Sequence, residues 1–205
     1  RISSYTPLVR SAYGYRRSPP DHIYDWFELR QVIDADAAFS PSLFCIKQYE
    51  LNEAFTPDLL RTPLDIHEME PDTTFYENEL TGFRYLLFVG TLSRIKGVDL
   101  IADAIPEIIH AFPDVHFVFI GRDDGMPDGS KMMEYILAKN REHGNQLHYS
   151  QAVPKAQLLP ILAHAIGILM PSRVDNYPNS CLEAQMLGVP VIGTCNSSLD
   201  EMIEN

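Results

Sequence analysis

The sequence lacks the features that mark several large classes of protein. It has 16 Lys and Arg against 28 Asp and Glu, a formal net charge of −12, and no basic cluster beyond the adjacent Arg16 and Arg17. Binding to nucleic acid, or broad contact with an anionic membrane surface, needs concentrated basic charge, so we expect neither. No apolar run approaches the ~20 residues that span a bilayer. No signal peptide is recognisable, and the start at Arg1 leaves an upstream one open.

Cysteine and histidine are also few and are not spaced for metal binding. The 3 cysteines form no CxxC pair and leave one over, which predicts buried thiols in a reducing compartment. The 7 histidines show no HExxH or similar spacing, so we assign no metal and no cofactor. Asp34-Ala35-Asp36 resembles a metal-binding DxD motif. It falls where a predicted helix passes into a predicted strand, and we interpret it as a solvated turn.

The composition is that of a globular protein, and the residue pattern changes near Pro63. Hydrophobic residues make up 45% of the chain, which is enough for a packed core. Helical spacing is expected over 23–34 and 43–52, with a short strand over 35–40 between them. Residues 53–82 are then rich in acids and prolines, which is typical of a linker or an entry segment. We place a domain boundary near Pro63.

After this boundary, strands and helices alternate. We expect strands at 85–89, 115–120, 147–150, 166–170 and 189–192, and helices at 98–112, 131–143, 154–165, 180–187 and from 198 onward. Right-handed crossovers between such strands build a parallel sheet with helices on both faces. The sequence therefore predicts an α/β domain that binds its ligand at the carboxyl edge of the sheet.

The stretch 170–193 has chemistry to offer at that edge. Asp175 and Glu183 are two carboxylates separated by seven residues. Between them lie Asn176, Asn179 and Ser180, close to the start of a predicted helix. A helix N-terminus presents free N–H groups and favours phosphate, and flanking carboxylates can accept hydrogen bonds from sugar hydroxyls. A nucleotide-sugar fits this arrangement better than a bare nucleotide.

A simpler interpretation of the same residues stays open. Ser180-Cys181-Leu182-Glu183 has the pattern of a capping box, in which Glu183 bonds back to a backbone N–H and touches no ligand. Such boxes are common helix starts, so this stretch alone does not decide between the two.

A second loop is expected at the same edge. Gly90 follows the first strand of the domain and permits a tight turn, and Lys96 offers a mobile cation for a diphosphate. Arg94 is a further candidate for that role. Gly121 and Arg122, at the end of the next strand, add a third contact with weaker support.

These residues resemble a known family. FVGTLSRIKGVDLI, FVFIGRD, ILMPSRVDNYPNSCLEAQMLGVPVIG and SSLDEMI resemble the donor-binding domain of family 4 retaining glycosyltransferases (glycosyl transferases group 1), which have the GT-B fold. The resemblance is dense over 85–205 and looser over 23–66. It implies that 64–205 is a Rossmann-like nucleotide-sugar donor domain, incomplete at its C-terminus. Residues 1–63 would be the end of a second α/β domain, the acceptor-side domain, with its linker.

The resemblance also implies a role for each candidate residue. Asp175 would hold hydroxyls of the transferred sugar, Glu183 the ribose, and Lys96 the diphosphate; these three are our candidate catalytic residues. The donor would also be approached by Gly90, Thr91, Arg94, Gly121, Arg122, Asn176, Tyr177, Pro178, Asn179 and Ser180. Thr91 stands where the family usually has arginine, and DNYPN replaces the common EGFG segment, a variant able to alter which sugar is accepted.

The implied function is transfer of a sugar from a UDP- or GDP-linked donor to a sugar or glycolipid acceptor, with retention of anomeric configuration. A nucleotide-sugar epimerase, a phosphorylase on the same fold and a non-catalytic nucleotide-binding module are the alternatives. We expect a cytoplasmic location, with any contact to the inner face of the membrane made by the missing part of the acceptor-side domain. Without that part, we expect the chain to be inactive alone.

Overall fold

The computed structural model describes residues 26–27, 30, 34–51, 56–64, 70–125 and 129–203. The chain forms two compact units. The first contains 1–63, 173–178 and 195–205, and the second contains 64–172 and 179–194. The first division falls after Pro63, and two later segments of the chain join the first unit.

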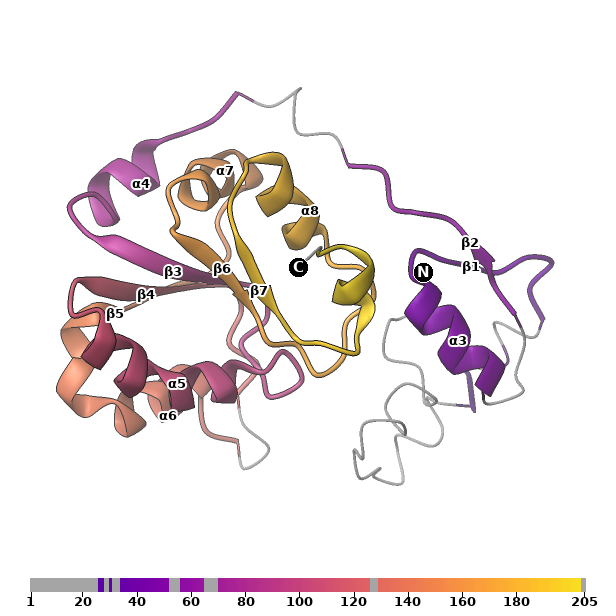
Figure 1. The fold of residues 1–205 in the computed structure, drawn as a ribbon, viewed down its shortest axis with the longest axis horizontal. Coiled ribbons are helices and arrows are strands. Elements are labelled where there is room, and N and C mark those ends of the chain that lie inside the picture. The colour runs from indigo at the N-terminus through magenta and orange to yellow at the C-terminus, as the bar shows by residue number, and fades with distance from the viewer. Residues whose placement is uncertain are drawn as a thin grey trace. The chain divides into compact units, whose positions relative to one another are not determined.

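The second unit is built on one parallel sheet of five strands (Figure 1). In chain order the strands are β3 (Arg84–Val89), β4 (Val115–Ile120), β5 (Leu147–Ser150), β6 (Gly167–Met170) and β7 (Val191–Gly193). Their order across the sheet is β5-β4-β3-β6-β7, and every neighbouring pair is parallel. The chain therefore reverses its direction of growth between β3 and β6, which is where sheets of this kind bind ligands.

Helices cover both faces of this sheet (Figure 1). On one face lie α5 (Val98–Ala111) and α6 (Met132–Lys139), followed by the 3₁₀ helix Arg141–Gln146. On the other face lie α4 (Thr74–Glu79), α7 (Lys155–Ala163) and α8 (Asn179–Met186). The α/β class and the two covered faces are as predicted.

The main core lies between the sheet and the α5–α6 layer. Alternate residues of β3 and β4, such as Phe88 and Phe119, point into it, because successive side chains of a strand face opposite ways. Val98, Ile101, Ile105 and Ile109 meet them from one face of α5, at the spacing of an amphipathic helix. Burial of such side chains stabilises the fold by about 1.5 to 3 kcal/mol each.

Several local expectations were wrong. α4 was not predicted, because its six residues lie in an acid-rich stretch next to prolines that suggested a linker. The helix expected over 131–143 ends at Lys139, and a 3₁₀ helix follows. The helix expected from 198 is a 3₁₀ helix over Ser198–Glu201. Cys45 and Cys181 are buried as expected, but Cys195 is exposed.

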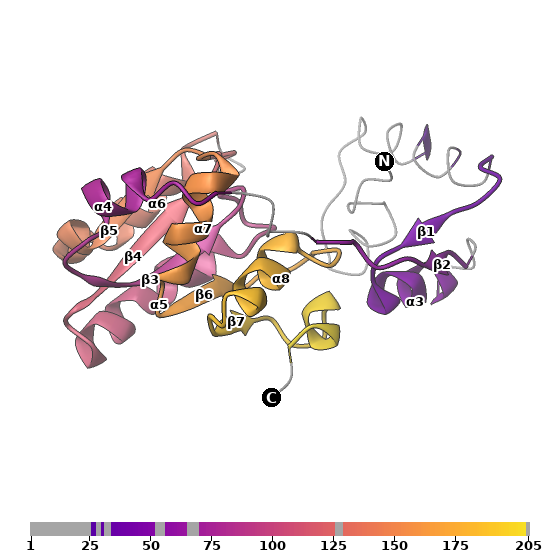
Figure 2. The ribbon, with the colours of Figure 1, turned by 90° about the horizontal axis from the view of Figure 1, so that it is seen from above.

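The first unit contains a pair of short parallel strands, β1 (Phe39–Ser40) and β2 (Asp58–Leu59), beside α3 (Leu43–Leu51) (Figure 2). Residues 198–201 pack onto α3 in the same unit. Asp34 and Asp36 are exposed in a turn, which confirms the interpretation of the DxD pattern. Most of the helix predicted over 23–34 lies outside the described residues. Within the described part of the chain, no helix is long and apolar enough to cross a membrane.

Candidate functional site

Three loops meet at the carboxyl edge of the sheet in the second unit. An ideal Cβ on Gly97 would lie 1.9 Å from the carbonyl oxygen of Pro171, directly after β6. A Cβ on Gly121 would lie 1.9 Å from the carbonyl oxygen of Gly90, directly after β3. Gly97 and Gly121 also have φ of +71° and +145°, which side chains disfavour. The loops after β3, β4 and β6 are therefore packed backbone to backbone, as the prediction of a shared edge requires.

The loop after β3 carries two basic residues. Lys96 directly precedes Gly97 and is partly exposed. Arg94 is more exposed, and its Nε lies 3.4 Å from Oδ2 of Asp99 in the first turn of α5. Arg94 is thus directed toward its own helix, and Lys96 stays the predicted phosphate contact of this loop.

Arg122, after β4, is engaged in a similar way. Its Nε and Nη2 donate to the two carboxylate oxygens of Asp124 at 2.5 and 3.0 Å. The side chain is 76% exposed. A ligand phosphate would compete with this two-point pair, which makes Arg122 a weaker candidate than its position suggested.

Glu183 lies inside α8 and is buried, with 8% of its surface exposed. Because α8 begins at Asn179, Ser180 is within the first turn and not at the N-cap. The capping-box interpretation was therefore wrong. The partner of Glu183 is Lys155, the first residue of α7, whose Nζ lies 3.2 Å from Oε1.

Two helix N-termini point to the same edge as Lys96. α5 starts directly after Gly97, and α8 starts at Asn179, eight positions beyond Pro171. A helix N-terminus carries a partial positive charge. In α5 the N–H groups of Val98 and Leu100 already donate to the carbonyl oxygens of Ser93 and Gly97. A diphosphate placed here would meet Lys96 and the positive ends of these helices, while Glu183 offers an acceptor to hydroxyl groups.

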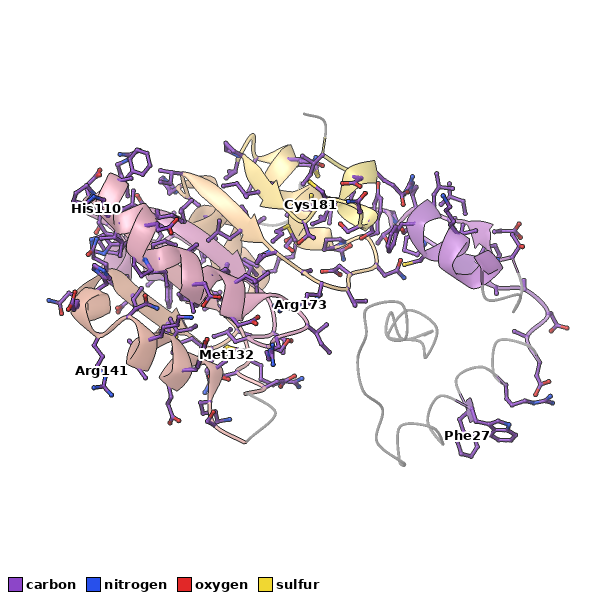
Figure 3. The ribbon with its side chains drawn as sticks, turned by 60° about the horizontal axis from the view of Figure 1, so that its bottom comes forward. Phe27, His110, Met132, Arg141, Arg173 and Cys181 are labelled. Atoms are coloured by element: carbon purple, nitrogen blue, oxygen red, sulfur yellow. The ribbon has the colours of Figure 1, made fainter. Side chains whose placement is uncertain are left out.

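The loop with Asp175 belongs to the first unit. The backbone N–H of Asn176 donates to Oδ1 of Asp175 at 3.0 Å. The Oδ1 atom of Asn176 is buried with no hydrogen-bond partner, which costs free energy unless a donor meets it. Tyr177 has a φ of +61°, a strained conformation of the kind found at functional sites. Arg173, also in this loop, is labelled in Figure 3.

The structure thus divides the predicted residues between the units. Asp175, Asn176, Tyr177 and Pro178 are in the first, and the others, with Lys96 and Glu183 among them, are in the second. Sequence reasoning missed Lys155, which the predicted order of elements places at the carboxyl edge as the first residue after Pro154. For metal binding, the described residues contain no group of three or more His, Cys, Asp or Glu with suitable placement.

This combination of fold and edge defines the class of protein: a Rossmann-like α/β domain of the kind found in GT-B glycosyltransferases. Solved structures with the same fold include sucrose-phosphate synthase from Thermosynechococcus elongatus, at a TM-score of 0.71 and 18% identity over 96% of this chain and 50% of that one. HepE from Anabaena, solved in complex with UDP-glucose, has a TM-score of 0.71 and 16% identity over 91% of this chain and 53% of that one.

A family model described as "Glycosyl transferases group 1" matches residues 83–205, and the chain belongs to this family. It is 31% identical over 120 residues to a 2-deoxystreptamine N-acetyl-D-glucosaminyltransferase from Niallia circulans, covering 58% of this chain and 30% of that protein. It is 29% identical over 131 residues to spore coat protein SA of Bacillus subtilis, and the match covers 61% of this chain and 34% of that protein. The chain spans about a third of the length of these relatives.

Proposed function

We propose that this chain is the donor-binding part of a retaining glycosyltransferase that takes its sugar from a nucleoside diphosphate. The observation that carries the proposal is the meeting of the loops after β3 and β6 at Gly97 and Pro171. It fixes Lys96 at the sheet edge where α5 and α8 begin. Membership of the glycosyltransferase family over 83–205 and the UDP-glucose complex of HepE support the same assignment.

In this proposal each part of the donor has its own contact. In the second unit, Lys96 and the helix N-termini are assigned to the diphosphate and Glu183 to the ribose hydroxyls. In the first unit, the family resemblance assigns Asp175 to the transferred sugar, and Asn176 offers a buried oxygen without a hydrogen-bond partner. When the sugar leaves, negative charge develops on the diphosphate, and preorganised N–H groups and a cation stabilise that charge. Retention of configuration rests on the family resemblance, and Asp175 is assigned to hydroxyl binding, not to nucleophilic attack.

The test is calorimetric titration of the full-length protein with UDP, GDP and ADP. One of the three is expected to bind, and Glu183→Gln and Lys96→Met are each expected to weaken its binding by about 1 to 3 kcal/mol. Glu107→Gln and Lys139→Met, which change an exposed residue of α5 and one in the last turn of α6, serve as matched controls. A folded protein that binds none of the nucleotides would contradict the proposal.

One observation favours a second candidate, a nucleotide-binding module without catalysis. Thr91 replaces the arginine usual in the family, while Arg94 and Arg122 are paired with Asp99 and Asp124. The diphosphate then relies on Lys96 as its main cation. Hydrolysis of a nucleotide-sugar by the full-length protein, with release of the sugar in the configuration of the donor, separates the enzyme from the module.

A further inference from the structure

Within the first unit, Glu201 is the centre of a network that the proposed function does not use. Its Oε1 accepts hydrogen bonds from the Ser42 hydroxyl at 2.9 Å and from the Phe44 N–H at 2.6 Å. Its Oε2 accepts from the Leu43 N–H at 3.0 Å and from Nη1 of Arg61 at 2.8 Å. A residue near the end of the described chain thus caps the N-terminus of α3, where anionic groups are stabilised.

The carboxylate is held in its charged form. Burial by itself would raise the pKa of Glu201, but the N–H groups of Phe44 and Leu43 and the side chains of Arg61 and Ser42 outweigh it and lower the pKa below its usual value. Its side chain is 14% exposed. Hydrogen bonds between charged partners in such a setting are about twice as strong as neutral ones.

The same 3₁₀ helix holds the loop that carries Asp175. Ser198, at its start, is fully buried. Its hydroxyl donates to the carbonyl oxygen of Asp175 at 3.0 Å and accepts from the N–H of Tyr177 at 3.3 Å. One hydroxyl therefore fixes the backbone on both sides of Asn176, next to the strained φ of Tyr177.

Arg61 contacts both Glu201 and the loop that carries Asp175. Besides its bond to Glu201, its Nη1 donates to the carbonyl oxygen of Pro41 at 2.7 Å. Its guanidinium carbon lies 4.5 Å from the centre of the Tyr177 ring, a distance at which a cation and an aromatic face attract. Glu201 orients Arg61, and Arg61 covers the ring of the strained residue.

We propose that Glu201 and Arg61 are positioning residues for sugar transfer, which hold the Asp175–Tyr177 loop in the conformation that the transferred sugar requires. The inference rests on the proposed function, because that function assigns Asp175 to the transferred sugar and so requires an ordered loop. The nucleotide contacts, Lys96 and Glu183, belong to the other unit. Loss of the network therefore affects the sugar end of the donor and leaves nucleotide binding intact.

The experiment compares nucleotide affinity with turnover in the full-length protein. The variants are Glu201→Gln, Arg61→Lys and Ser198→Ala, and the probes are UDP with UDP-glucose and GDP with GDP-mannose. Because small errors in placing a substrate lower catalysis steeply, kcat is expected to fall by roughly ten- to a hundredfold in Glu201→Gln. The Kd of the nucleoside diphosphate is expected to stay within about twofold of wild type, because the substitutions leave the nucleotide contacts Lys96 and Glu183 unchanged.

A pair in the same unit provides the control. Arg30 and Asp34 form an ion pair at 2.8 Å, the same distance as Arg61 and Glu201, but both side chains are at least half exposed. Asp34→Asn and Arg30→Lys are expected to leave both kcat and Kd unchanged. Thermal melting of each variant identifies any that fails to fold, and Arg61→Lys, which keeps the charge, then replaces Glu201→Gln as the deciding variant.

Three results would overturn the inference or its basis. An unchanged kcat in both Glu201→Gln and Arg61→Lys would show that the network does not position the loop. An equal loss of nucleotide affinity and kcat would show a general structural role. Failure of the wild-type protein to bind UDP or GDP would instead overturn the proposed function.

Discussion

Lys155 Nζ lies 3.2 Å from Glu183 Oε1, and this ion pair joins the first residue of α7 to the interior of α8. The side chain of Glu183 is 10% exposed and that of Lys155 is 35% exposed. A carboxylate this deep needs a partner, because an unpaired buried charge is costly. Lys155 therefore supplies the counter-charge of Glu183 at the sheet edge.

A double-mutant cycle between Lys155→Met and Glu183→Gln is expected to give a coupling free energy of about 1 to 3 kcal/mol in urea unfolding, because one partner is buried. The matched control is the Arg84–Asp114 pair, which is 2.9 Å long with side chains 60% and 59% exposed. Its coupling is expected to stay below about 1 kcal/mol. Equal coupling in both pairs would contradict the view that burial makes the first one matter.

Gly97→Ala is expected to destabilise the protein strongly. The new Cβ meets both a positive φ and the Pro171 carbonyl oxygen. Gly188→Ala is the control, because Gly188 has a φ of +70° and no atom within 4 Å of the added Cβ. We expect a loss of about 1 to 2 kcal/mol at Gly188 from φ alone, and a further loss of about 1 to 3 kcal/mol at Gly97 from overlap. Urea unfolding measures both, and equal losses would disprove the close contact.

His116 and His148 predict a dependence of stability on pH. Nδ1 of His116 lies 2.8 Å from Nε2 of His148. The ring of Phe83 stacks on both imidazoles, with its centroid 4.2 Å from that of His116 and 4.6 Å from that of His148. Burial lowers the pKa of His116, and the charge of Asp114, which would raise that pKa, is the smaller effect. Burial lowers the pKa of His148, and the charge of His116 lowers it further. The charge of Glu79 acts in the opposite direction but is the smaller effect. The unfolded chain therefore takes up protons at a higher pH than the folded one.

It follows that the free energy of unfolding is highest above the ordinary histidine pKa of 6.5 and falls as the pH drops below it. Urea unfolding between about pH 7.5 and about pH 5.5 measures the slope. His148→Phe is expected to flatten it. His110→Gln, at the exposed end of α5 (Figure 3), is expected to retain it, and a His148→Phe slope equal to wild type would rule out the pair as its source.

Tyr85→Phe is expected to lower the free energy of unfolding by about 0.5 to 1.5 kcal/mol. The Tyr85 hydroxyl donates to the Ile161 carbonyl oxygen at 2.7 Å, and the residue is 1% exposed. Burial, with a smaller effect from Tyr76, raises the pKa of this phenol. Tyr149→Phe, at a residue that is 39% exposed, is the control and is expected to change little. Comparable losses in the two variants would remove the role of the hydrogen bond.

The centre of the sheet could be predicted from the sequence because β3, β4 and β6 are mainly apolar runs between turn residues. The runs 85–89 and 115–120 are confirmed almost to the residue by β3 and β4. α4 escaped prediction because a six-residue helix leaves too short a pattern. Predicted helix starts lie within one residue of the observed ones, but at Asn179 that one residue was enough to make Glu183 resemble part of a cap.

The candidate site was predictable where it depends on local sequence and hidden where it depends on long-range contacts. Gly90, Lys96 and Gly121 follow strands of a parallel sheet, so their edge could be deduced. Lys155 is 28 positions before Glu183, and Arg61 is 140 positions before Glu201. Pairs at such separations are set by the packing of elements, which no local pattern records.

The contact between Gly97 and Pro171 also limits how the site can move. At Gly97 a backbone oxygen of Pro171 occupies the space that a side chain would need, so the chain has no room to move toward Pro171 at this point. The backbone of this loop is therefore held at Gly97 against the backbone that follows β6. Gly97 is therefore a suitable reference position when distances to other segments are measured in the full-length protein.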